Sequence, residues 1–332
     1  APGRNVVVTS GTGSGKTESF LLPVMIRIVE EALRGGPEQP VHEWWSAPKK
    51  PWRSSRAEPK RRPAARAMVL YPTNALVEDQ ITRLRSAVRA IASGGGPQLW
   101  FGRYTGSTLG SGKPPSGTKV DRRVAAIARE VAGAAAEYDA LKQAGGIDLS
   151  QFPDPRQGEL LTRWEMVTTP PDVLVTNYSM LNAMLMRDTE EPLFESTRQW
   201  LAADAQNTFS LVVDELHLYR GTQGSEVAMI VRNLLSRLGL EPDSPQLRCL
   251  ATSASLSDDE SSLDYLEQFF GVDRTSFFVT PGRARSIDAS LPISSAELER
   301  VWSDSPPEER VRSVVDRFDL PVSVAAACRG AD

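Results

Sequence analysis

The chain has 332 residues, a formal net charge of −4, 24% charged residues and 40% hydrophobic residues. This composition is that of an ordinary globular protein, and no apolar run is long enough to cross a membrane. Two cysteines, Cys249 and Cys328, exclude a disulfide framework and a Cys-rich zinc site, so we expect a cytoplasmic protein without a membrane partner. Because the sequence begins without Met and almost inside a strand, we expect it to be part of a longer protein.

Short apolar runs alternate with amphipathic stretches along the sequence. The apolar runs span residues 5–10, 67–72, 98–106, 172–177, 210–215 and 247–253. Runs of this kind suit strands of a parallel sheet that is covered on both faces. The amphipathic stretches at 17–33, 75–92 and 222–239 suit helices. The alternation predicts an α/β fold with a doubly wound, mainly parallel sheet.

Two segments interrupt this alternation, and we interpret both as insertions in a domain that spans residues 1–281. The first, at about 35–66, is rich in Pro, Trp and basic residues, and the second, at about 107–165, contains an Ala-rich helix near 119–144. We expect residues 282–332 to be a linker or the truncated start of a following domain.

The first insertion is strongly basic, because residues 43–66 contain eight Lys or Arg and two Glu. One hypothesis is contact with nucleic acid, with Lys and Arg neutralising phosphates and Trp44, Trp45 or Trp52 stacking on bases. The other is a solvated loop whose tryptophans pack on the parent domain.

Residues 10–17, SGTGSGKT, follow an apolar run and precede a predicted helix. Glycines at this spacing let successive backbone N–H groups surround a phosphate, and the helix N-terminus adds a partial positive charge. The pattern predicts an ATP site made of Gly11, Thr12, Gly13, Ser14, Gly15, Lys16 and Thr17. We expect Lys16 to reach the β- and γ-phosphates and the Thr17 hydroxyl to bind Mg²⁺. A Gly-rich turn without a ligand is the alternative, but the strand, loop, Lys-Thr pair and helix occur together.

Two acids and one of the two histidines end another apolar run, in LVVDELH. A buried, unpaired acid pair would be unstable, whereas acids at the end of a strand can hold Mg²⁺ through water and activate the attacking water. Asp214 is therefore predicted to bind Mg²⁺ with Thr17, and Glu215 to activate water. We count Lys16, Asp214, Glu215 and His217 as the catalytic group of a nucleotide hydrolase.

Five motifs occur in the order and spacing of motifs I, Ia, Ib, II and III of superfamily 2 helicases: SGTGSGKT, YPTNALVEDQ, VTNYSML, VDELH and LATSAS. The chain thus resembles the first RecA-like domain of a DEAD/DEAH-box-type helicase over roughly residues 4–280, insertions excepted. Residues 170–186 and 214–238 resemble the Lhr/YprA branch, which includes MrfA-type DNA repair helicases. The resemblance implies a RecA-like P-loop fold, ATP and Mg²⁺ as cofactors, and ATP-dependent movement on DNA.

The resemblance also implies roles outside the nucleotide site. Contacts with the nucleic-acid backbone are implied for Pro72, Thr73, Asn74, Arg103, Tyr104, Thr105, Gly106, Thr176, Asn177 and Tyr178. Coupling of hydrolysis to strand movement is implied for Ser253, Ala254 and Ser255, where Ser255 replaces a usual threonine and keeps its hydroxyl. Polar side chains and free N–H groups suit phosphate contacts, which fix position without specifying bases. As alternatives, Thr73 or Asn74 caps a helix and the TSAS segment is another cap.

A complete motor of this superfamily has a second RecA-like domain that supplies an arginine finger, and no such pattern occurs here. We therefore expect this chain alone to bind ATP weakly and to hydrolyse it poorly, with the second domain of the same parent chain as a partner. Single-stranded or tailed duplex DNA is the expected substrate, in DNA repair or phage defence with partner proteins of those systems. RNA stays open, as does a nucleotide-regulated switch that binds nucleic acid or protein without unwinding.

Overall fold

The structure is a computed structural model that describes residues 4–9, 15–46, 52–115 and 122–281. The predicted ATP-site residues Gly11, Thr12, Gly13 and Ser14 and the predicted linker 282–332 lie outside the described residues. Within the described ranges, no helix is both long enough and apolar enough to cross a membrane.

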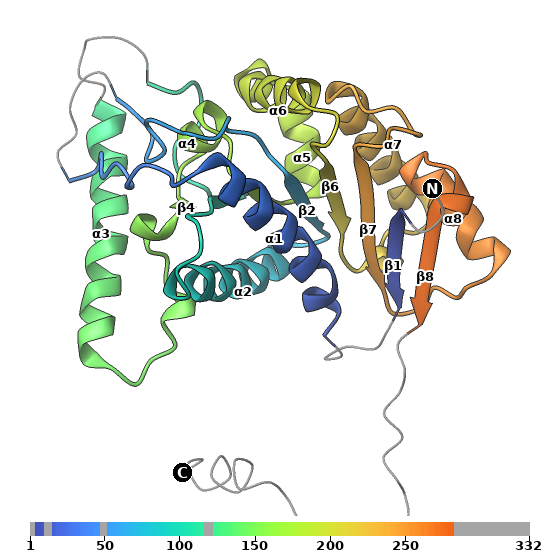
Figure 1. Cartoon of the computed structure of the whole chain (residues 1–332), viewed down its shortest axis with the longest axis horizontal. Coiled ribbons are helices and arrows are strands. Elements are labelled where there is room, and N and C mark those ends of the chain that lie inside the picture. The colour runs from blue at the N-terminus through green and yellow to red at the C-terminus, as the bar shows by residue number, and fades with distance from the viewer. Residues whose placement is uncertain (1–3, 10–14, 47–51, 116–121, 282–332) are drawn as a thin grey trace, which may run out of the picture. The chain divides into compact units, whose positions relative to one another are not determined.

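Eight strands form one sheet in the order β4-β3-β5-β2-β6-β7-β1-β8, and every pairing between them is parallel (Figure 1). The strands are β1 (Asn5–Thr9), β2 (Ala67–Tyr71), β3 (Phe101–Tyr104), β4 (Glu159–Leu160), β5 (Val173–Asn177), β6 (Phe209–Val213), β7 (Leu247–Ser253) and β8 (Phe277–Pro281). All six predicted strands are present, while β4 and β8 were not predicted.

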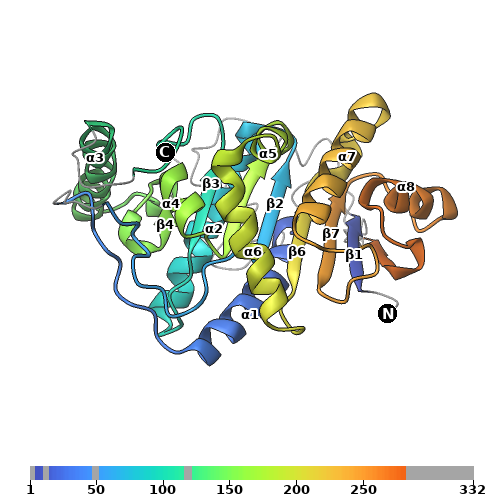
Figure 2. The ribbon, with the colours of Figure 1, turned by 90° about the horizontal axis from the view of Figure 1, so that it is seen from above.

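The helices cover both faces of the sheet, as a doubly wound fold requires (Figures 1 and 2). They are α1 (Lys16–Gly35), α2 (Asn74–Ser93), α3 (Arg122–Ala144), α4 (Arg163–Thr168), α5 (Tyr178–Leu185), α6 (Glu191–Ala203), α7 (Gly221–Arg237) and α8 (Glu260–Phe270). Short 3-10 helices span Leu149–Gln151, Pro155–Gln157, Asp188–Glu190, Leu216–Leu218 and Arg274–Ser276. The predicted α/β fold with a parallel sheet is confirmed.

Two hydrophobic clusters hold these layers together. On one face, apolar side chains of α1 and α2, such as Ile28 and Ile81, pack on Val69 and Val212 of the sheet. On the other face, α5, α6, α7 and α8 pack on a larger cluster that includes Leu211. Because the central strands are buried on both faces, they appear in the sequence as continuous apolar runs.

The two insertions pack against each other in a third hydrophobic cluster. Trp44 and Trp45 of the first insertion are buried with Val131 of α3 and with Trp164 of α4. Trp44 lies edge-to-face against Trp45, and the indole N–H of Trp44 donates to the Glu165 carboxylate at 2.9 Å. These tryptophans are therefore core residues, as the packing hypothesis for this segment requires.

Three arginines at the end of the first insertion surround a buried acid. Arg61 and Arg66 lie 2.9 Å and 3.1 Å from the carboxylate of Asp172, and Arg56 lies at 3.7 Å. Burial would raise the pKa of Asp172, but the three guanidinium charges outweigh it and lower the pKa to about 2. Three of the eight basic residues of this segment are thus buried in ion pairs with the domain, while Lys60 and Arg62 are exposed.

Candidate nucleotide-binding and strand-contact site

Because the sheet is parallel, the carboxyl ends of its strands meet at one edge. The register pairs Thr9 with Ser253 and Tyr71 with Asn177, so β1, β7, β2 and β5 end at the same level. The predicted motifs follow these strand ends directly. The fold therefore gathers at one edge the segments that the sequence separates by up to about 240 residues.

The end of the P-loop lies against the acid motif. Gly15 precedes α1 with φ 82°, a left-handed conformation that favours glycine, and Lys16 and Thr17 begin the helix. Lys16 is buried, and its Nζ lies 2.9 Å from Oε1 of Glu215. The cation predicted to bind phosphate is thus aimed at the group predicted to activate water.

Asp214 is held rigidly at the end of β6. Its Oδ1 accepts hydrogen bonds from the Thr252 hydroxyl and, at 3.0 Å, from the Glu215 backbone N–H. Burial raises the pKa of Asp214, and the hydrogen bonds from Thr252 and Glu215 oppose that rise. Thr252 was not among the predicted site residues, although it belongs to the LATSAS motif. Its hydroxyl holds the orientation of the Asp214 carboxylate.

Glu215 connects the P-loop with His217. It has φ 51°, the one positive φ among the described non-glycine residues, and such strained conformations occur often at functional sites. Its Oε2 lies 3.2 Å from Nδ1 of His217, and the backbone nitrogen of Ala254 lies 3.3 Å from the same Nδ1. His217 therefore contacts both the predicted water-activating group and the predicted coupling motif.

The coupling motif lies at the end of β7. Ser253 is fully buried, and its Oγ accepts the backbone N–H of Ser255 at 3.2 Å. The Ser255 hydroxyl accepts a hydrogen bond from Arg220 at 3.1 Å, so the serine that replaces threonine does bond through its hydroxyl. The alternative that this segment caps a helix is wrong, because Asp259 is the N-cap of α8.

A cavity of about 400 Å³ lies between the first turn of α1, α2 and the acid motif. It is lined by Gly15, Lys16, Thr17, Glu18, Leu76, Asp79, Gln80, Arg83, Asp214 and Glu215. The Thr17 hydroxyl and the Asp214 carboxylate supply oxygen, the donor that Mg²⁺ prefers. The described part of the chain contains no cluster of three His, Cys, Asp or Glu residues that would hold a metal. The two oxygen donors of this cavity are of the kind that suits Mg²⁺.

The two predicted strand-contact segments after β2 and β5 touch each other. The Asn177 amide donates to Oδ1 of Asn74 at 2.6 Å. Thr73 is the N-cap of α2 and accepts the backbone N–H of Leu76, so the capping role is confirmed for this residue. Thr73 and Asn74 are exposed beside the half-buried Pro72. This pair of segments offers polar groups at the edge of the sheet.

Several other predicted strand-contact side chains are turned into the domain. Thr176 is fully buried and donates to the backbone oxygen of Tyr104 at 2.7 Å, while the Tyr104 hydroxyl donates to Glu190 at 2.8 Å. Thr105 is likewise buried. Any contact of these residues with a strand would come from main-chain groups.

The remaining predicted residues are at least partly accessible, and each has a partner in the domain. Arg103 forms an ion pair with Glu78. Gly106 is exposed, and its backbone oxygen accepts a hydrogen bond from Arg163 at 2.8 Å. The Tyr178 hydroxyl accepts the Gln223 amide at 3.1 Å. Among these contacts, Gln223 at the start of α7 was not predicted by the sequence.

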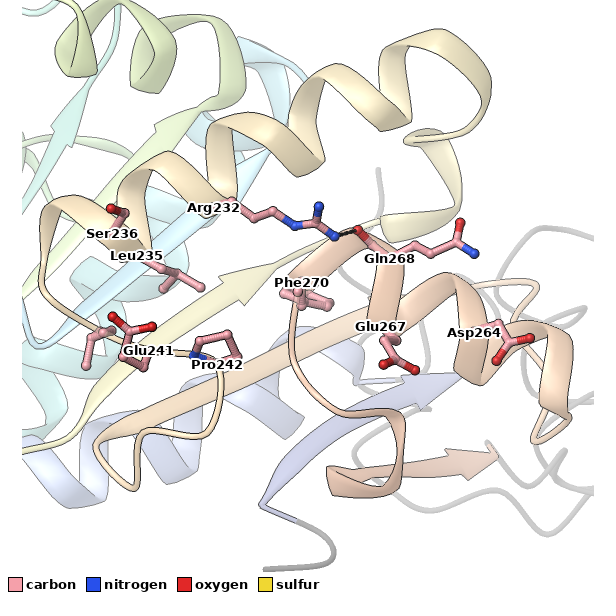
Figure 3. A pocket seen from close by; sticks show the side chains of 11 residues that line it. Arg232, Leu235, Ser236, Glu241, Pro242, Asp264, Glu267, Gln268 and Phe270 are labelled. Atoms are coloured by element: carbon pink, nitrogen blue, oxygen red, sulfur yellow. Dashed lines mark hydrogen bonds between the residues drawn. The ribbon is translucent and has the colours of Figure 1, made fainter.

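A larger cavity, of about 780 Å³, lies between α7 and α8 (Figure 3). Its wall combines apolar side chains such as Leu235 and Phe270 with the charged side chains Arg232 and Glu267. Arg232 donates to the backbone oxygen of Gln268 across this cavity. None of the predicted site residues lines it, so we place the chemistry in the smaller cavity.

Comparison with known proteins agrees with these motifs. A family model for the DEAD/DEAH box helicase matches residues 1–100. Druantia protein DruE of Escherichia coli (strain UMEA 4076-1) is 33% identical over 341 residues, which cover 88% of this chain and 17% of DruE. The uncharacterized ATP-dependent helicase MJ1574 of Methanocaldococcus jannaschii is 29% identical over 113 residues, or 34% of this chain and 15% of that protein.

A crystal structure of the DUF1998 helicase MrfA bound to DNA and AMPPNP has a TM-score of 0.45 and 19% sequence identity, and covers 83% of this chain and 24% of MrfA. The chain spans less than a fifth of the length of the curated relatives, DruE and MJ1574. The family-model match over residues 1–100, the identity with DruE and the motifs that meet at one edge of a parallel sheet show that this chain is similar to DEAD/DEAH box helicases, with an Asp-Glu-x-His motif beside the end of the P-loop.

Proposed function

We propose that this chain is the ATP-binding domain of a motor that couples ATP hydrolysis to movement on DNA. The observation that carries the proposal is one continuous chain of contacts at the sheet edge. Lys16 pairs with Glu215, Glu215 with His217, and His217 with the backbone of Ala254. The phosphate-binding, water-activating and coupling groups are thereby in direct contact.

We assign a role to each group at the nucleotide. Lys16 exchanges its bond with Glu215 for the phosphates of ATP, which frees the carboxylate to accept a proton from the attacking water. Thr17 and Asp214 are the groups that would hold Mg²⁺, which supplies charge neutralisation on the phosphates when bound. Asn74 and Asn177, together with backbone groups beside them, are suited to contact phosphates of the strand.

DNA is the substrate that we propose, by resemblance, and strand-backbone contacts would also accept RNA. A place in DNA repair or in phage defence, with proteins of those systems, stays a prediction. A nucleotide-regulated switch without unwinding is less well supported, because Lys16, Asp214 and Glu215 are all present and Lys16 contacts Glu215.

The test is the ATPase rate of the full-length protein with and without single-stranded DNA, with RNA and this 332-residue chain measured in parallel. We expect strong stimulation by DNA in the full-length protein and very low rates in the chain alone. A missing arginine finger can lower the rate by about 10³- to 10⁵-fold. Lys16→Ala should abolish ATP binding while the fold survives. Unchanged nucleotide affinity in that variant, or equal rates with and without nucleic acid, would contradict the motor.

A further inference from the structure

Gln80 reaches the nucleotide site from a motif that is expected to contact nucleic acid. It lies on α2, and only 8% of its surface is exposed. Its Nε2 lies 3.1 Å from Oγ1 of Thr17, and both residues line the cavity that also contains Asp214. Within the described residues, the side chain that hydrogen-bonds the predicted Mg²⁺ ligand Thr17 therefore comes from α2.

The chemistry of a threonine hydroxyl gives this contact a consequence. The hydroxyl has one proton and two lone pairs, and it binds a cation only when a lone pair is turned toward it. Free rotation would leave that orientation to chance. The Gln80 amide fixes it, because Nε2 donates to one lone pair of the hydroxyl and leaves the other lone pair available to Mg²⁺.

We propose that Gln80 is a positioning residue that orients Thr17 for Mg²⁺ and so ties Mg²⁺-nucleotide binding to α2. This inference rests on the proposed function and deepens it. Partners that orient a metal ligand commonly change metal affinity by about 10- to 100-fold when they are removed.

Neighbouring charged residues hold the Gln80 side chain in place and connect α2 with α1. Its Nε2 is also 3.4 Å from the Asp79 carboxylate, which pairs with Arg83 at 3.3 Å. Arg83 in turn pairs with Glu18 in the first turn of α1 at 2.8 Å. Since α2 begins at Asn74 with Thr73 as its cap, the same rigid helix carries the strand-contact segment at its start and Gln80 at the nucleotide.

The test is the Mg²⁺ dependence of binding of a fluorescent ATP analogue to the full-length protein. Gln80→Met keeps the length of the side chain but removes the amide. We expect the Mg²⁺ concentration for half-maximal binding to rise by about 10-fold or more, while the affinity in EDTA stays unchanged. Gln80→Glu should not keep the wild-type midpoint, because its carboxylate cannot donate to Thr17 and would face the Asp79 carboxylate. Ser86→Met, at an exposed position of α2, is the matched control.

A wild-type Mg²⁺ midpoint in Gln80→Met would overturn the inference and leave the proposed function intact. So would an equal loss of affinity with and without Mg²⁺, since Gln80 would then only maintain the shape of the cavity. Failure of the wild-type protein to bind nucleotide under any condition would instead overturn the proposed function. If Gln80→Met does not fold, Gln80→Ala gives the same comparison with a smaller side chain.

Discussion

The carboxylate of Glu215 contacts both Lys16 and His217. These two contacts predict how the site responds when the negative charge of Glu215 is removed. Glu215→Gln keeps the size of the side chain but removes the proton acceptor that faces Lys16 and His217. We expect ATP binding to persist and turnover by the full-length protein to fall by about 10²- to 10⁴-fold. A nucleotide-binding assay measures the affinity for ATP, and single-turnover hydrolysis measures the rate of the chemical step. Turnover near the wild-type rate would remove Glu215 from the water-activating role.

The sequence predicted functional residues that belong to a short local motif. It did not predict the hydrogen-bond partners of these residues, which lie far away in the sequence. Lys16, Asp214 and Glu215 stand in short motifs at strand ends, where the residue type itself indicates phosphate or Mg²⁺ chemistry. Thr252 and Gln80 act through hydrogen bonds to residues 38 and 63 positions away, and no local spacing encodes such contacts. Burial of Thr176 and Thr105 also depends on the tertiary fold, so the sequence could not indicate that their side chains are buried in the domain.

At the scale of elements, the central strands and long helices were predictable because each has its own periodicity. The two-residue strand β4 carries no periodic signal, and Phe278 in the edge strand β8 is more than half exposed. The first insertion illustrates the limit best. Its positive charge indicated nucleic acid, yet Arg61 and Asp172, 111 positions apart, form a buried ion pair.

That ion network predicts a pH-dependent stability. The pKa of Asp172 is lowered from 3.8 to about 2, so its ionised form stabilises the fold by about 2 kcal/mol above pH 4. The unfolded chain takes up the proton first as the pH falls, so this stabilisation is lost between about pH 4 and pH 2. Asp172→Asn removes the carboxylate that all three guanidinium groups share, while Arg56 and Arg61 keep Glu38 and Arg66 keeps Glu31. Loss of the shared buried charge should reduce the free energy of unfolding by about 3–5 kcal/mol at pH 7.

Urea unfolding of the wild-type protein and Asp172→Asn at pH 7 and pH 3 measures this difference. We expect the gap between the two proteins to narrow at pH 3. Lys60→Glu, at an exposed position of the same insertion, is the control and should change the unfolding free energy little. A gap that does not depend on pH would mean that Asp172 stabilises the insertion by packing and not by charge.

At the scale of the whole molecule, the domain has two cores on the sheet and a third between the insertions. Trp44 belongs only to the third, where it packs on Trp45 and Trp52 and bonds to Glu165. Trp44→Ala creates a cavity there and should remove about 3–5 kcal/mol of local stability. Since the sheet cores keep their contacts, we expect the nucleotide site to survive this change.

Hydrogen exchange shows whether the two insertions unfold independently of the sheet or together with it. In Trp44→Ala, amides of α3 should exchange faster, while those of β1 and β6, which border the nucleotide site, should keep their protection. Ile147→Ala, at a residue that is 46% exposed, is the matched control and should leave both regions unchanged. If β1 and β6 lost protection together with α3, the insertions would stabilise the whole domain. ATP binding would then depend on the tryptophan cluster as well as on the P-loop. The reason is that β1 and β6 position Lys16 and Glu215, and the contact between these two residues requires both strands to stay folded.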